Sequence, residues 1–168
     1  MSRGFVKESD QEELPIIPPR APLPPGIDNY VTPNGLQELQ AEKAALEQEK
    51  ADYPTTNEDE HRRATTVIDG KLALLQKRIN SARLIKPADQ PQEEVRFGAK
   101  VTLQNSGLPK PQTFQIVGVD EANVKEAKLA FTAPIVQAIT GLYEGETATF
   151  NLGGGTRQLK VLNISYEV

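Results

Sequence analysis

Residues 33–54 read PNGLQELQAEKAALEQEKADYP and residues 68–82 read IDGKLALLQKRINSA, and these two stretches decide the fold. The first is rich in Ala, Glu, Gln and Lys, which are strong helix formers. Thr32-Pro33 is typical of a helix start, because a threonine caps the first amides and a proline suits the first helical position. In the second stretch, apolar residues recur with the 4-3-4-3 step of a coiled-coil seam: Ile68, Leu72, Leu75, Ile79 and Ala82.

A short turn joins the two predicted helices. Pro54 ends the first helix because its ring disfavours a helical conformation for the residue before it. Thr55 and Thr56 each precede an acidic residue by three positions, which is capping-box spacing, and Pro87 stops the second helix. Residues 32–86 are therefore predicted to form an antiparallel coiled-coil finger, with arms of roughly 30–40 Å.

The segments on either side of the finger differ from it in composition. Residues 1–31 contain six prolines, which predict a disordered or extended tail, and residues 87–94 form an acidic linker. Residues 95–168 show the period-two alternation of strands, with a short helix predicted from Pro134 to Gly141 and a turn at the glycines 153–155. The predicted fold class is α+β, in which a helical hairpin precedes a small β-rich domain of about five strands.

Composition excludes several classes of function. The chain of 168 residues has no Cys and a single His, which excludes disulfides, thiolate sites and a multi-histidine metal centre. No apolar run approaches the roughly 20 residues that span a bilayer, and no secretory signal is evident, so a cytoplasmic location is expected. The net charge of −4, with no concentrated basic patch, argues against independent sequence-specific binding of nucleic acid.

The order of several segments resembles the Gre family of transcription elongation factors. The likeness is carried by residues 32–36, 96–103, 114–122, 133–141 and the glycines 153–155. The opening residues MSRGFVKE further resemble a short-fingered branch of that family.

The resemblance implies a fold, a partner and a mechanism. Residues 95–168 would be an FKBP-like domain, RNA polymerase the partner, and the finger would enter the secondary channel of the polymerase. Two acids at the tip would help hold a magnesium ion in the polymerase active site, which then cleaves its own backtracked transcript. The chain itself would be no enzyme and would carry neither a cofactor nor a metal of its own.

The candidate residues at the fingertip are Glu58, Asp59 and Glu60. The tip reads TTNEDEH over residues 55–61, where the family has an Asp followed three positions later by Glu-Asn, so no acid transfers by motif match. The three acids either steer the metal ion or only complement the exposed amides at a helix start. His61 beside them is expected to be a solvated helix residue.

The candidate docking residues are Thr132, Ala133, Pro134 and Ile135. In the family, the matching segment contacts a coiled coil of the polymerase, and Pro134 matches that pattern. The alternative interpretation is a helix start with proline in its preferred position.

Other functions remain open at this stage. A channel-binding inhibitor or competitor would use the same finger without stimulating cleavage. A prolyl isomerase or chaperone would need a pocket lined by aromatic side chains, for which the β-rich domain offers Phe97, Phe114, Phe131, Tyr143, Phe150 and Tyr166. A further alternative is a structural protein that self-associates through its helices. The short turn instead favours pairing of the two helices within one chain, and thus a monomer.

Overall fold

The computed structural model describes residues 15–167. They divide into two compact units, one built mainly from Leu39–Asn80 and the other from Ala21–Glu38 with the chain from Ser81 onward. The first unit is helical and the second is built on a curled β-sheet, so the predicted α+β class is confirmed. None of the helices within this range is long and apolar enough to cross a membrane.

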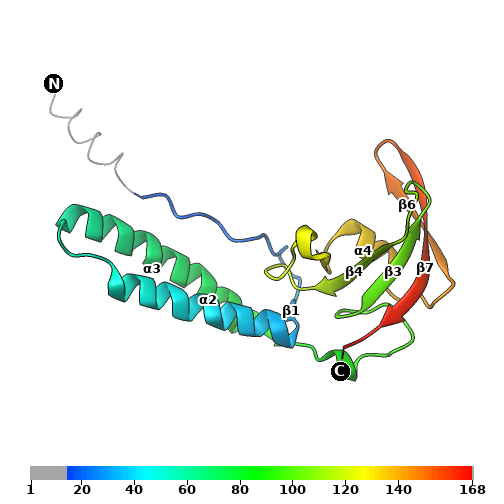
Figure 1. The fold of residues 1–168 in the computed structure, drawn as a ribbon, viewed down its shortest axis with the longest axis horizontal. Coiled ribbons are helices and arrows are strands. Elements are labelled where there is room, and N and C mark those ends of the chain that lie inside the picture. The colour runs from blue at the N-terminus through cyan, green and yellow to red at the C-terminus, as the bar shows by residue number, and fades with distance from the viewer. Residues whose placement is uncertain (1–14, 168) are drawn as a thin grey trace. The chain divides into compact units, whose positions relative to one another are not determined.

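The predicted helical hairpin is present (Figure 1). Helix α2 (Pro33–Asp52) spans 20 residues and helix α3 (Glu58–Ser81) spans 24, which correspond to about 30 Å and 36 Å at 1.5 Å per residue. The two helices run antiparallel, and an ion pair of 2.8 Å joins Lys50 to Asp69 across them.

Leucine and isoleucine side chains form the seam of the hairpin. Leu39 and Leu46 of α2 are buried, as are Ile68 and Leu75 of α3, and each pair is separated by seven residues. This spacing returns the side chain to the same face after two turns. The seam that the sequence predicts is therefore the interior of the hairpin.

The ends of α3 differ from the prediction. The Asn57 side-chain oxygen accepts a hydrogen bond of 3.1 Å from the Glu60 amide, so Asn57 caps the helix and neither Thr55 nor Thr56 does. The helix also ends at Ser81, well before Pro87. It stops there because the next residues leave the helix to form a strand.

That strand, β2 (Ala82–Leu84), pairs in parallel with β1 (Asn29–Val31). Strand β1 lies within the segment that was predicted to be a disordered or extended tail, and the prediction is wrong for its last three residues. The physical reason is that residues 29–31 contain no proline and bury Val31, which makes pairing favourable. Residues 1–14 of the predicted tail lie outside the described residues.

The preceding part of the tail contacts the hairpin. The Arg20 guanidinium binds both carboxylate oxygens of Glu42, at 2.6 and 3.1 Å. The Ile17 side chain fills the space in which a Cβ at Gly70 would stand, whereas Ile16 is 88% exposed. Within the helical unit, residues 17–20 therefore pack on the hairpin.

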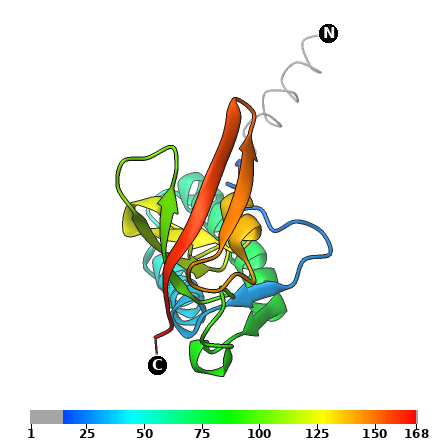
Figure 2. The ribbon, with the colours of Figure 1, turned by 90° about the vertical axis from the view of Figure 1, so that its right-hand side faces the viewer.

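The second unit is built on a five-stranded sheet with the order β5-β4-β3-β7-β6. Its strands are β3 (Lys100–Asn105), β4 (Gln112–Val117), β5 (Lys128–Ala130), β6 (Thr147–Leu152) and β7 (Gly155–Ser165). Only β4 and β5 pair in parallel; the other neighbours are antiparallel. Figure 2 shows β6 beside the long strand β7, joined by the predicted glycine turn.

Helix α4 (Pro134–Ile139) completes the core of this unit. It begins with proline in the first turn, as predicted, and Gly141 beyond its end has the positive φ of +89° that favours glycine. Val136 and Ile139 of α4 are buried together with alternating residues of the strands, among them Val101, Leu103, Ile116, Leu159 and Val161. Two 3₁₀ turns, η1 (Pro87–Asp89) and η2 (Val124–Glu126), lie in the connections.

Tyr166 fixes the connection between the hairpin and the sheet from within this unit. Its hydroxyl donates a hydrogen bond of 2.6 Å to the Glu94 carbonyl and accepts one of 2.9 Å from the Arg96 amide. Burial raises the pKa of the phenol above its usual value of 10.0. The ring therefore joins residues near the end of the chain to the segment 94–96.

We expect Tyr166→Phe to lower the free energy of unfolding by about 1–3 kcal/mol, because the Glu94 carbonyl and the Arg96 amide lose their buried partner. Because the folded state raises the phenol pKa, the neutral form is favoured on folding. Its contribution is complete below about pH 10 and is lost as the pH rises through the folded-state pKa. Urea denaturation between pH 8 and 11 should show a smaller alkaline loss for Tyr166→Phe than for the wild type.

Candidate functional site

The tip of the hairpin is a turn that His61 closes. The His61 Nδ1 lies 3.2 Å from the Pro54 carbonyl oxygen, and its ring centroid lies 6.0 Å from that of Tyr53. Because a carbonyl can only accept, Nδ1 carries the proton in this contact. His61 is a helix residue, as expected, and its half-buried ring also ties the first turn of α3 to the end of α2.

Glu58, Asp59 and Glu60 occupy the first turn of α3, and all three are exposed. Asp59 forms an ion pair of 2.9 Å with Arg62, one turn along the helix. The helix dipole favours negative charge at this end, which is a structural reason for acids here. The sequence prediction of an acidic cluster at the tip agrees with the positions of these side chains.

The tip acids do not form a metal centre by themselves. Within residues 15–167, no group of three or more His, Asp or Glu side chains has the arrangement that could hold a metal ion. Carboxylate oxygens are nevertheless the ligands that magnesium prefers. Among residues 15–167, the tip acids are therefore carboxylates of the kind that magnesium prefers, without a metal-binding cluster of their own.

Of the predicted docking residues, Thr132 and Ala133 lie in the turn after β5, and Pro134 and Ile135 open α4. Pro134 is exposed at the start of α4, and Thr132, Ala133 and Ile135 are half-buried. The Ala133 carbonyl accepts the first helical hydrogen bond, of 3.0 Å, from the Gln137 amide. The turn thus starts a helix and also presents a rigid proline to the surface.

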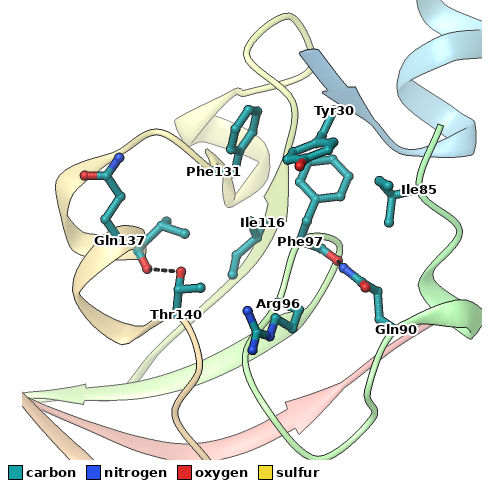
Figure 3. A pocket seen from close by; sticks show the side chains of 10 residues that line it. Tyr30, Ile85, Gln90, Arg96, Phe97, Ile116, Phe131, Gln137 and Thr140 are labelled. Carbon is teal, nitrogen blue, oxygen red and sulfur yellow. Dashed lines mark hydrogen bonds between the residues drawn. The ribbon is translucent and has the colours of Figure 1, made fainter. Parts of the chain in front are cut away.

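A pocket of about 500 Å³ lies beside this turn in the β-sheet unit. Phe131 and Val136, the residues that flank the predicted docking segment, both line it. The rings of Tyr30, Phe97 and Phe131 pack against one another, with centroid separations of 5.3–5.7 Å (Figure 3). They form the aromatic wall of a cavity whose floor includes Ile116.

Polar groups surround the apolar part of the pocket. Arg96 and Gln137 are exposed, Gln90 donates a hydrogen bond of 3.0 Å to the Phe97 carbonyl, and the Thr140 hydroxyl donates one of 2.7 Å to the Val136 carbonyl. Figure 3 shows these side chains around the cavity: Gln137 from α4, Thr140 directly after α4, Gln90 directly after η1, and Arg96 from the segment before β3. An apolar wall with a polar rim suits an apolar side chain of a partner, or a proline.

Only part of this pocket was foreseen from the sequence. Of the six aromatic residues proposed for an isomerase pocket, Phe97 and Phe131 line it, and Phe114, Tyr143, Phe150 and Tyr166 do not. Tyr30 was missed because it lies in the predicted tail. Its position in a strand next to buried Val31 depends on pairing with residues 82–84, for which the local sequence carries no signal.

Comparisons with known proteins find relatives of this sequence. Residues 90–166 match the family model described as Transcription elongation factor, GreA/GreB, C-term. Transcription elongation factor GreA of Ralstonia nicotianae is 34% identical over 119 residues, which cover 70% of this chain and 72% of that protein. GreA of Halorhodospira halophila is 31% identical over 71% of this chain and 73% of its own length.

A solved structure also matches this chain. The prokaryotic transcription elongation factor GreA/GreB from Nitrosomonas europaea is 17% identical, with a TM-score of 0.40. The match covers 82% of this chain and 98% of that one.

Proposed function

The chain belongs to the GreA/GreB family of transcription elongation factors, and from this premise we propose that it binds RNA polymerase and regulates elongation. In this proposal the hairpin enters the secondary channel of the polymerase and the chain acts as a monomer in the cytoplasm. The observation that supports it best is a hairpin with a buried apolar seam and an exposed acidic tip, next in sequence to the matched domain. The chain is a regulator of the polymerase and has no catalytic activity of its own.

We assign to the tip a role in transcript cleavage by the polymerase. A magnesium ion in the polymerase active site would supply the activated water for hydrolysis. Glu58 and Glu60 are exposed, whereas Asp59 is engaged by Arg62, so the two glutamates are the better placed to approach such an ion. The contribution of this chain is to bring carboxylate oxygens to the site and to keep them on a rigid helix end.

We assign the pocket beside α4 to docking. Pro134 and the aromatic wall of Tyr30, Phe97 and Phe131 offer the combination of a rigid apolar anchor and a pre-formed cavity. Protein interfaces commonly depend on one apolar or aromatic side chain that fills such a pocket. The partner in this proposal is an apolar side chain of the polymerase coiled coil that the resemblance implies.

Gln137→Trp tests the docking assignment, because residue 137 is exposed at the rim of the pocket and a bulky indole there would obstruct the cavity. We expect the variant to weaken polymerase binding by about tenfold or more, as for loss of an interface anchor. The matched control is Gln112→Trp, which makes the same change at an exposed position of β4. If fluorescence titration gives equal affinities for the two variants, the pocket is not the docking site.

The direct test of the proposed function is association with the cognate RNA polymerase. A fluorescent label on the wild-type chain should show saturable binding to elongation complexes, in proportion to the polymerase present. If no association is detected in titration or in pull-down, the proposal is wrong. Binding without any effect on cleavage of a stalled, backtracked complex would instead identify a channel-binding inhibitor or competitor.

A prolyl isomerase is the second candidate, and the aromatic wall of the pocket is the observation that favours it. Such a site would hold a proline of the substrate against the rings of Tyr30, Phe97 and Phe131. A protease-coupled isomerisation assay decides between the two functions. Catalysed isomerisation that is lost in Phe97→Ala, in a chain that does not bind polymerase, would support the enzyme.

A further inference from the structure

Thr32 lies at the start of α2 and makes two hydrogen bonds with one hydroxyl. It accepts a hydrogen bond of 2.9 Å from the Gly35 amide, which is the usual contact of a helix cap. It also donates one of 2.6 Å to the Glu121 carboxylate. The cap of α2 is thereby joined to a residue 89 positions later in the chain.

Glu121 is a buried acid with a complete set of partners. Its side chain is 3% exposed, and its second oxygen accepts a hydrogen bond of 2.9 Å from the Asn34 amide and lies 3.4 Å from the Lys128 ammonium. A buried carboxylate is unfavourable unless hydrogen bonds and opposite charge compensate for lost hydration. Here two residues of the α2 start and one residue of β5 provide that compensation.

The backbone around this contact is fitted closely. A Cβ at Gly35 would stand 2.8 Å from the Glu121 carboxylate oxygen, and a Cβ at Gly118 would overlap the Tyr30 carbonyl. The loop that carries Glu121 is closed by hydrogen bonds from the Glu121 and Ala122 amides to the Gly118 carbonyl, at 3.2 and 3.1 Å. The Glu121 carboxylate therefore reaches the first turn of α2 from a hydrogen-bonded loop. The positions of Gly35 and Gly118 leave no room for a side chain larger than that of glycine.

We propose that Glu121 is a positioning residue for the start of α2: its carboxylate holds the first turn of this helix in one orientation on the β-sheet unit to which both belong. Hydrogen bonds to Thr32 and Asn34 are directional, whereas apolar packing alone would allow the helix start to rotate. Residues 21–38 belong to the same compact unit as Glu121, so this contact lies inside one unit. The inference adds to the proposed function a residue whose role is to orient the first turn of α2.

The absence of Cys from the chain allows the proposal to be tested in the free protein. Spin labels on Glu38→Cys and Lys160→Cys, two exposed positions of the β-sheet unit, report the distance distribution between the first turns of α2 and strand β7 by pulsed electron paramagnetic resonance. We expect Glu121→Ala to broaden this distribution by about twofold, because the start of α2 loses both directional bonds. Glu121→Gln, which keeps the shape and one acceptor, should broaden it less.

Two further variants keep the test decisive. Asn34→Ala removes one donor from an exposed residue without disturbing the core, and should broaden the distribution in the same direction if Glu121→Ala fails to fold. Glu167→Ala is the matched control, since it removes an exposed carboxylate that lines the same cavity as Glu121, and should leave the width unchanged. Distributions of wild-type width in folded Glu121→Ala and Asn34→Ala would overturn the proposal.

This measurement uses no polymerase, so its outcome is independent of the proposed function. If the wild type binds polymerase, Glu121→Ala should also weaken binding, while its circular dichroism spectrum keeps the helix signal of the wild type. If the wild type does not bind polymerase, the proposed function fails and the distance measurement still decides whether Glu121 positions the start of α2.

Discussion

Leu75→Ala is expected to lower the free energy of unfolding of the hairpin by about 2–5 kcal/mol. Leu75 of α3 is 0% exposed, so truncation removes buried methyl groups and leaves a cavity. An isolated pair of helices of this length has few other buried side chains to share the loss: Leu39, Leu46 and Ile68 are the remaining buried members of the seam. We therefore expect the variant to lose helix content at temperatures where the wild type is folded.

Urea denaturation followed at 222 nm measures this effect, because the helices dominate that signal. The matched control is Leu152→Ala, the same substitution at a position of β6 that is 49% exposed, where we expect a change within about 0.5 kcal/mol. Leu74→Ala, at a half-buried neighbour of Leu75, should fall between the two. A midpoint for Leu75→Ala that matches that of Leu152→Ala would show that the seam does not stabilise the hairpin.

The hairpin could be predicted from the sequence because its signals are local and repeated. The seven-residue spacing of Leu39 and Leu46, and of Ile68 and Leu75, defines one face of each helix over several turns. The short helix α4 was also predictable, since Pro134 at its start and Gly141 beyond its end are both local signals.

Long-range contacts explain what the sequence could not reveal. Strands β1 and β2 have three residues each, and their pairing joins Asn29 to Ala82 and Val31 to Leu84, far apart in the chain. A three-residue strand has too few positions for a recognisable alternation. The pocket depends on this pairing because β1 brings Tyr30 to Phe97 and Phe131. Nothing in the local sequence indicates the pairing, and Tyr30 was therefore assigned to the tail.

Glu121 illustrates the same limit for a charged residue. In the sequence it is one of two adjacent acids in the segment 114–122, and nothing local distinguishes it from Asp120. Its burial and its bonds to Thr32 and Asn34 follow from contacts made across nearly ninety positions. The three tip acids present the opposite case, since an N-terminal helical turn keeps them exposed whatever the rest of the chain does.

Replacing Glu58, Asp59 and Glu60 together by alanine is expected to lower the stimulated rate of transcript cleavage by about 100-fold, the scale of effect when a reacting group is misplaced. Polymerase binding should change by no more than about threefold, because exposed charges contribute little to affinity. The measurement is cleavage of a stalled, backtracked elongation complex at saturating concentrations of each variant. Saturation separates the role of the tip from any loss of binding.

The matched control for the tip replaces Glu38, Glu47 and Glu49 by alanine, which makes the same change of charge at exposed positions of α2, outside the first turn of α3. Both triple variants remove three negative charges, so an effect of net charge would appear in both. The control should cleave at the wild-type rate because its carboxylates lie outside the first turn of α3. Among single variants, Glu58→Ala and Glu60→Ala should lower the cleavage rate more than Asp59→Ala does, since Arg62 already forms an ion pair with Asp59. Wild-type cleavage by the tip variant would remove the tip from the reaction, and would leave occupancy of the channel by the hairpin as the means of regulation.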